Sequence, residues 1–158
     1  MTTIYTDFET QSIVDLTEHG SYNYSKHYTT RVNSVCVCNE HGDTLLSWSG
    51  GADLDFPAQE LFTLYASADQ IMCHNNFFEY CIYNHCLVRL YGIPPILDWA
   101  KWGCTKALAQ THALPGKLEF VAKALQLEQK KSDATVMRKM SRPRSITFEG
   151  PVWWKHDT

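Results

Sequence analysis

The segment from Phe77 to Tyr91 constrains the fold more than any other part of the sequence. It is almost entirely apolar, and Gly92 followed by Pro94-Pro95 marks its end. A helix that is apolar on every side must be buried inside a protein. Because no apolar run reaches the roughly 18 residues that a membrane span needs, we expect this helix in the core of a folded domain, with no membrane partner.

The rest of the chain supplies the strands and helices that such a domain needs. We expect strands at residues 2–9, 32–39, 44–48 and 70–73, and helices at 57–66, 77–91, 99–112, 117–126 and 133–141. The first three strands predict antiparallel hairpins, and the later strand predicts a parallel crossover. The 158 residues contain no long linker, so the sequence predicts a single α/β domain over residues 1–158.

Composition places the chain among ordinary globular proteins. Hydrophobic residues make up 44% and charged residues 20%, which excludes disorder. The start, MTTIYTDFET, lacks the basic and apolar regions of a signal peptide, so we expect a cytoplasmic protein with reduced thiols. We interpret the six cysteines as packing residues, including Cys36 and Cys38 on one strand face. The alternative, a zinc site around Cys81 and His85, lacks a C-x-x-C pair.

Charge is divided unevenly along the chain. The net charge of −3 by itself argues against a nucleic-acid-binding protein. Residues 130–144, however, hold one acid, Asp133, and the basic residues Lys130, Lys131, Arg138, Lys139, Arg142 and Arg144. These basic residues either follow a DNA backbone through phosphate contacts or form the solvated face of a surface helix. The sequence leaves both interpretations open.

Three carboxylates stand out as candidate site residues. Asp7 and Glu9 are two positions apart on the first strand and therefore share one face. They are either harmless acids on a solvent-facing strand or, since central α/β strands are usually covered on both faces, like charges that need a cation. Glu79 is the single acid between Gln70 and Leu97, in the first turn of the apolar helix. It is either a buried metal ligand or an acid that stabilises the helix dipole.

A site built from these acids has a definite chemical preference. Carboxylate oxygens suit Mg²⁺ or Mn²⁺ better than zinc. A pair of such ions can activate water and stabilise the leaving oxygen in phosphodiester cleavage. His74-Asn75 adds polar groups at the strand-to-helix corner, where sites in open α/β sheets usually lie.

Taken in order, these residues resemble a known family. Asp7-Phe8-Glu9-Thr10 resembles the first motif of the DEDD-type 3′–5′ exonucleases, the proofreading domains of family A DNA polymerases. A likeness to the second motif of the same family follows in His74-Asn75-Asn76-Phe77-Phe78-Glu79, where Glu79 replaces the more common Asp. The likeness to the bacteriophage-type polymerases continues through Gly20-Ser21-Tyr22, Trp102-x-Cys104-Thr105, Leu114-Pro115-Gly116-x-Leu118, Lys130-Lys131, Ser141-Arg142-Pro143-Arg144 and Pro151-Val152-Trp153-Trp154. It therefore runs along essentially the whole chain.

The resemblance implies a ribonuclease H-like fold and the removal of nucleotides from a DNA 3′ end by two-metal hydrolysis. It makes Asp7, Glu9 and Glu79 the catalytic residues and the ligands of Mg²⁺ or Mn²⁺. The implied substrate is single-stranded DNA or a DNA 3′ end, bound by Phe8, Thr10, His74, Asn75, Lys130, Lys131, Arg142 and Arg144. Two of these residues have an alternative role. Asn75 can cap the following helix, and Phe8 can pack beneath the site instead of stacking on a base.

The chain departs from the family at the third motif, a Tyr followed four residues later by an Asp on a C-terminal helix. That helix should follow Pro151-Val152-Trp153-Trp154, whereas this sequence ends at Thr158. We therefore expect an exonuclease-like domain without this helix and without the polymerase region. A polymerase or another replication partner would supply the missing helix. The sequence leaves two functions open: an exonuclease weakened by truncation, or a non-catalytic nucleic-acid-binding or accessory module.

Overall fold

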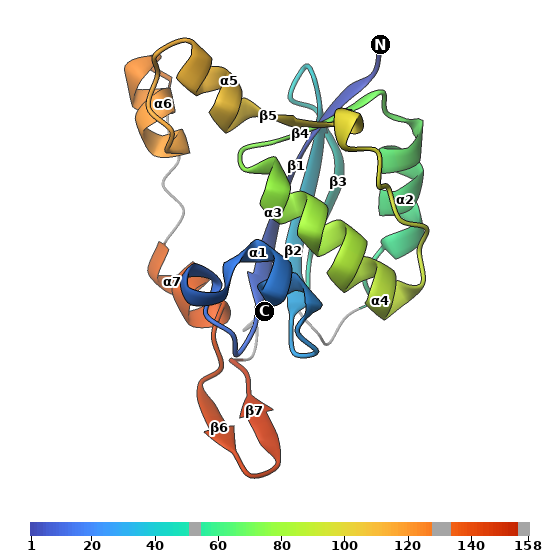
Figure 1. The fold of residues 1–158 in the computed structure, drawn as a ribbon, viewed down its shortest axis with the longest axis vertical. Helices are drawn as coiled ribbons and strands as arrows, with labels where there is room; N and C mark the ends of the chain where they lie inside the picture. Colours follow the sequence, from blue (N-terminus) through green and yellow to red (C-terminus); the bar gives the residue numbers. More distant parts are fainter. Residues whose placement is uncertain (51–54, 128–133, 155–158) are drawn as a thin grey trace.

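A five-stranded mixed sheet forms the centre of the computed structural model, which describes residues 1–50, 55–127 and 134–154. The strands are β1 (Thr3–Gln11), β2 (Arg31–Asn39), β3 (Thr44–Ser49), β4 (Gln70–Cys73) and β5 (Trp102–Cys104). Their order is β3-β2-β1-β4-β5 (Figure 1). Strands β1, β2 and β3 pair antiparallel, whereas β4 and β5 join in parallel. This confirms the predicted α/β fold and agrees with a ribonuclease H-like sheet.

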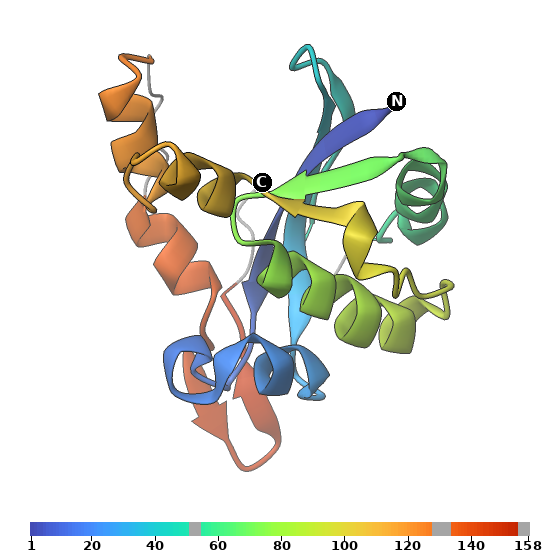
Figure 2. The same cartoon turned by 45° about the horizontal axis from the view of Figure 1, so that its top comes forward.

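The predicted apolar helix is a continuous rod built of three parts. These are α3 (Asn76–Cys81), the π-helical segment η2 (Ile82–Leu87) and α4 (Val88–Tyr91). Gly92 ends the rod with φ of 65°, a left-handed conformation that glycine adopts without strain. With α2 (Ala58–Ser67) the rod covers one face of the sheet (Figure 2).

The hydrophobic core lies between this helical layer and the sheet. The rings of Tyr65 from α2 and Tyr83 from η2 stack with centroids 5.1 Å apart, and both side chains are fully buried. The Tyr65 hydroxyl donates to Thr6 Oγ1 of β1 at 2.6 Å. The sheet contributes Ile4, Phe8, Val35, Val37, Ile71 and Trp102. The buried rod is therefore confirmed, because its side chains form the centre of this core.

One sequence prediction in this region is wrong. Residues 99–112, expected as a single helix, form the short 3-10 helix η3 (Trp99–Lys101), then β5, then α5 (Thr105–Thr111). Three residues are too few for a strand to show an alternating pattern, so pairing with β4 decides their conformation. Gly103 fits here because a Cβ at this position would lie 2.2 Å from Met72 Sδ.

Other elements were not predicted at all. Helix α1 (Leu16–Lys26) has a kink at Gly20, where φ is 71°, and its few apolar residues follow no clear helical period. The strands β6 (Ser145–Thr147) and β7 (Gly150–Val152) form a separate antiparallel hairpin. Each is only three residues long, which gives too little pattern to predict.

The segments after β5 form a second, more open region. They include α5, α6 (Leu118–Ala124), α7 (Ala134–Met140) and the β6–β7 hairpin. Helices α6 and α7 lie within the predicted ranges 117–126 and 133–141. Within the described ranges, we find no helix with the length and apolar character that crossing a membrane requires.

All six cysteines are free thiols, and they differ in burial, with Cys104 half-buried on β5. Cys73, Cys81 and Cys86 are buried, which confirms the predicted packing role. Cys36 is exposed and Cys38 is half-buried, so the same prediction is wrong for these two. Both lie on the sheet face opposite the buried Val35 and Val37.

Candidate active site

The first two candidate carboxylates lie where β1 extends past the end of β4. The two strands pair only over Thr3–Tyr5 of β1, so Asp7 and Glu9 follow beyond the last pair. Side chains alternate along β1 as predicted, and the inward positions are Ile4, Thr6, Phe8 and Thr10. Asp7 is exposed and Glu9 half-buried. The central strand is therefore open to solvent on this face at Asp7, which agrees with the first of the two interpretations of these acids and not with a strand covered on both faces.

The charge of Asp7 reaches both of the other candidate carboxylates. Burial is the main cause that raises the pKa of Glu9 to about 7, and the charge of Asp7 adds to it. Burial also raises the pKa of Glu79 to about 8, again with a contribution from Asp7. Although Asp7 reaches solvent, the atoms packed around its carboxylate partly desolvate it and raise its pKa, while the charge of His74 lowers it. Carboxylates that raise one another's pKa are typical of functional sites, and a bound cation reverses the effect.

Glu79 is the most deeply buried of the three acids. Its side chain is 4% exposed, and its Oε2 has no hydrogen-bond partner among the described residues. An unpaired buried acceptor costs about 1–3 kcal/mol. Its own backbone N–H in the first turn of α3 lowers the pKa, but burial has the larger effect. The helix dipole alone therefore does not compensate this carboxylate, and Oε2 is free to accept a ligand.

The corner between β4 and α3 holds the next two predicted residues. His74 Nε2 donates to the Gly116 carbonyl oxygen at 3.0 Å, and Nδ1 lies 3.0 Å from Thr105 Oγ1. His74 therefore ties the start of α5 and the loop before α6 to the site. Asn75 is exposed and stands at the N-cap position of α3, but its side chain makes no capping hydrogen bond. Its amide group is thus available at the surface.

A β-bulge lies opposite Glu9. The β1–β2 register shifts because Glu9 pairs with Ser34 whereas Thr10 pairs with Val32. This leaves Asn33 as an extra residue on β2, and its side chain is 4% exposed. Bulges are common next to active sites, where they redirect side chains. Only the three-dimensional pairing reveals this one.

The bulge connects the sheet to the C-terminal end of α7. Asn33 Nδ2 donates to the carbonyl oxygen of Met140 at 3.1 Å. The backbone N–H of Ser12, just after β1, donates to the carbonyl oxygen of Ser141, also at 3.1 Å. Met137 and Met140 of α7 line a pocket together with Glu9. These bonds place α7 beside the carboxylates.

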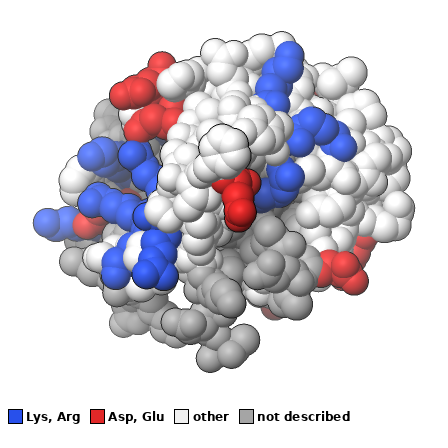
Figure 3. Space-filling model, turned by 90° about the horizontal axis from the view of Figure 1, so that it is seen from below, with Lys and Arg blue, Asp and Glu red and all other residues white. Residues whose placement is uncertain are grey.

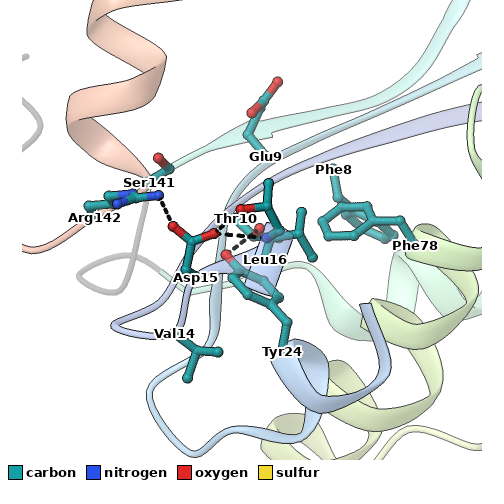
Figure 4. A pocket seen from close by; sticks show the side chains of 11 residues that line it. Phe8, Glu9, Thr10, Val14, Asp15, Leu16, Tyr24, Phe78, Ser141 and Arg142 are labelled. Carbon is teal, nitrogen blue, oxygen red and sulfur yellow. Dashed lines mark hydrogen bonds and ion pairs between the residues drawn. The ribbon is translucent and has the colours of Figure 1, made fainter. Parts of the chain in front are cut away.

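A second pocket, of about 330 Å³, opens next to Glu9 between β1, α1 and α3 (Figure 4). Phe8 and Phe78 form its aromatic side. Phe8 is only 4% exposed, so packing accounts for most of its surface. Thr10 is buried as well, and its Oγ1 lies 2.9 Å from the hydroxyl of Tyr24.

The predicted basic residues are only partly brought to this pocket. Arg142 lines it and forms an ion pair with Asp15. The guanidinium of Arg144 instead lies 5.6 Å from the ring centroid of Trp154, which Lys139 also approaches, at 5.8 Å. Lys130 and Lys131 lie outside the described residues. Figure 3 shows the end of the molecule that carries the hairpin, where Lys and Arg side chains gather on one side.

The chemistry of the donors fits a hard divalent cation, since all three are carboxylates and one has an unpartnered buried oxygen. The side chains are not yet arranged as a complete ligand set. Within residues 1–50, 55–127 and 134–154, no group of three or more His, Cys, Asp or Glu side chains is positioned to hold a metal ion. Binding of a divalent cation would require the exposed side chain of Asp7 and the half-buried side chain of Glu9 to rotate toward Glu79.

Sequence reasoning missed two residues that shape this pocket. Tyr24 comes from α1, which was not predicted. Asp15 caps α1 by accepting a hydrogen bond from Thr17 N at 2.8 Å. Hydrogen bonds from Thr17, followed by the interaction with Arg142, lower the pKa of Asp15 to about 2. The spacing of Asp15 and Glu18 is that of a capping box and would have revealed the helix start.

Comparisons with known proteins connect this chain to a viral replication enzyme. The chain is distantly homologous to a DNA polymerase of Bacillus phage SP02, with 33% identity over 145 residues. The match covers 85% of this chain but only 20% of the relative, so the chain spans about a fifth of that polymerase's length. No protein-family model matches the sequence.

Proposed function

We propose that this chain is a 3′–5′ exonuclease-like domain that hydrolyses phosphodiester bonds of DNA with Mg²⁺ or Mn²⁺. The observation that carries the proposal is the buried Glu79, whose Oε2 has no partner among the described residues and whose pKa, like that of Glu9, is raised by the charge of Asp7 as well as by burial. Its relation to a phage DNA polymerase supports DNA as the substrate. Proofreading of a DNA 3′ end is the corresponding role in replication.

Each carboxylate has a separate part in the proposal. Divalent ions held by carboxylates activate water and stabilise the leaving oxygen in phosphodiester cleavage. Glu79 Oε2 offers a fixed oxygen from the buried side. Asp7 and Glu9 offer side chains that can rotate, because both reach solvent on the open face of β1.

The surroundings of these acids suit a single strand of DNA. The pocket beside Glu9 has an aromatic side and, at Arg142, a positive rim. Aromatic surfaces stack on bases, and basic side chains bind phosphates without regard to sequence. The uncapped amide of Asn75 lies at the neighbouring corner and can donate to a phosphate or sugar oxygen. Arg142 must exchange Asp15 for a phosphate in order to contribute.

One observation favours the second function, a non-catalytic nucleic-acid-binding or accessory module. The carboxylates in the described residues are not positioned as a complete metal site. In this case the basic and aromatic groups would still bind DNA, and a polymerase or other replication protein would be the partner. For either function we place the protein in the cytoplasm of the host cell.

The decisive experiment measures trimming of 3′-labelled single-stranded DNA. The full chain is incubated with Mn²⁺, and in parallel with Mg²⁺, and shortened products are resolved on a gel. We expect metal-dependent loss of 3′ nucleotides that chelation stops. The Asp7→Ala variant should lower the rate by about 100-fold or more, as removal of a group that stabilises a charged transition state does.

The matched control is Glu60→Ala, because Glu60 is an exposed acid on α2, away from the site. This variant should trim DNA at the rate of the unaltered chain. Equal trimming by Asp7→Ala would show that the activity comes from another site or a contaminant. DNA binding without any trimming, with either metal, would favour the accessory module.

A further inference from the structure

Two cysteines lie beside the candidate active site, and their geometry is that of a metal-binding pair. Cys36 is exposed and Cys38 half-buried on the open face of β2, and their Sγ atoms are 3.7 Å apart. Zinc–thiolate bonds of about 2.3 Å in tetrahedral geometry place two sulfurs about 3.8 Å apart. The two sulfurs are therefore already spaced as two ligands of one tetrahedral ion.

A disulfide is a poor alternative for this pair. Alternate residues of an extended strand have Cα atoms about 6.8 Å apart. That is the upper limit of the roughly 4.4–6.8 Å range found in disulfides. Oxidation would require β2 to bend, and β2 is held on both sides by β1 and β3. Coordination of an ion requires no backbone movement.

Asp7 can supply a third ligand once its side chain rotates, because within the described residues no third donor already lies at the two sulfurs. It is the direct cross-strand partner of Cys36 in the β1–β2 ladder. Side chains of directly opposed residues share a face, with Cβ atoms about 4.5–5.5 Å apart. Asp7 is exposed, so its carboxylate is free to rotate toward an ion at the two sulfurs. Solvent can occupy the fourth position because this face is open.

We propose that Cys36, Cys38 and Asp7 form a site for a thiophilic divalent cation such as Zn²⁺ or Cd²⁺. Each thiol releases its proton to solvent when the sulfur binds the ion. Thiolates select such ions over Mg²⁺ and Mn²⁺, which prefer oxygen ligands. This site has sulfur ligands, unlike the candidate site of Asp7, Glu9 and Glu79, but the two sites share Asp7. A thiophilic ion bound here therefore withdraws Asp7 from Glu9 and Glu79.

The test titrates the reduced full chain with Cd²⁺, kept free of thiol reductants, and follows the ultraviolet charge-transfer band of cadmium–thiolate bonds. We expect the band to saturate at a single ion per chain, to be displaced by Zn²⁺ and to be unaffected by Mg²⁺. Loss of an outer-shell partner alone weakens metal binding by about 10–100-fold. Because Cys36→Ser and Cys38→Ser each remove a direct ligand, either change should weaken binding by about 100-fold. Asp7→Asn should weaken it by about tenfold.

The matched control is Cys104→Ser, since Cys104 is a half-buried thiol on β5 outside the pair. It should leave the titration unchanged. Protection of Cys36 and Cys38 from alkylation by Zn²⁺, mapped by mass spectrometry, provides a second measurement on the unaltered chain. No band, an equal band in Cys36→Ser and Cys38→Ser, or no protection would overturn the site. Neither measurement depends on nuclease activity, so the result stands apart from the proposed function.

Discussion

The body of the protein, from β1 to β5, and the segments after β5 are built in different ways. Among the described residues, the members of the central hydrophobic cluster run from Ile4 to Trp102, and the later segments add only Ala109 to the buried apolar side chains. The later segments instead expose large apolar side chains, among them Leu108, Leu118, Phe120, Leu127, Val136, Ile146 and Phe148. Packing therefore holds the backbone that carries the carboxylates, together with Phe8 and Phe78, in the body. Arg142 and Arg144 instead follow α7, on segments with little core of their own.

The two regions are joined mainly by polar contacts. Asn33 and the Ser12 N–H hold the end of α7, Arg142 pairs with Asp15, and His74 bonds to Gly116. Surface ion pairs contribute only about 0–1 kcal/mol each. The carboxylates and the basic segment after β5 are therefore stabilised separately, so they should respond separately to mutation.

The largest expected effect is on core packing. Leu61→Ala, at a fully buried position of α2, should lower the free energy of unfolding by about 2–5 kcal/mol. Leu118→Ala on α6 makes the same chemical change at a side chain that is 60% exposed and should cost less than about 0.5 kcal/mol. Urea denaturation of both variants measures the difference. Equal losses would show that α6 is packed as firmly as the body.

The next effect concerns pH and Glu79 in metal-free protein. The pKa of Glu79 is about 8 in the folded chain against an ordinary 4.5, so the folded state holds this proton more tightly than the unfolded state. Stability should therefore be greatest below pH 4.5 for this group and fall as pH rises toward 8.

Glu79→Gln tests this assignment, because glutamine keeps the shape and removes the charge. At pH 8 in a chelator it should stabilise the protein by about 2 kcal/mol, and much less at pH 5. Thermal unfolding at both pH values gives the comparison, with Glu60→Gln as the exposed control. A variant that is equally destabilised at both pH values would contradict the buried, unpartnered carboxylate.

A smaller effect is expected where the two regions meet. Arg142→Ala removes the ion pair with Asp15 and should change global stability by less than about 1 kcal/mol. Amide hydrogen exchange in α7 should nevertheless become faster, because one of its anchors is lost. Arg138→Ala, an exposed arginine on the same helix, should leave exchange unchanged. Unaltered exchange in Arg142→Ala would mean that the two remaining hydrogen bonds hold α7 alone.

The smallest effect is expected at the tip of the β6–β7 hairpin. Phe148 is fully exposed, so Phe148→Ser should change the free energy of unfolding by less than about 0.5 kcal/mol. Phe8→Ser, at a buried position of β1, is the contrasting change and should be strongly destabilising. Circular dichroism during denaturation separates them. A large loss in Phe148→Ser would show that the hairpin is part of the folding unit.

Local pattern was enough to predict much of the site. Alternation along β1 predicts Asp7 and Glu9 on one face, and the apolar segment predicts Glu79 in the first turn of its helix. The fold class followed from the order of strands and helices. Exposure was harder to predict: the sequence leaves open whether Asp7 faces solvent or lies under cover, and it predicts Cys36 in the core, whereas both residues are open to solvent.

The sequence by itself determined which side chains share a face and which helix must be buried, since both depend on the regular periods of strand and helix. The tertiary structure alone decided the β-bulge at Asn33, the strand β5 and the meeting of Arg142 with Asp15, 127 positions apart. Such features depend on partners distant in the chain. It also set the spacing of the Cys36 and Cys38 sulfurs, which depends on side-chain rotation as well as on the strand.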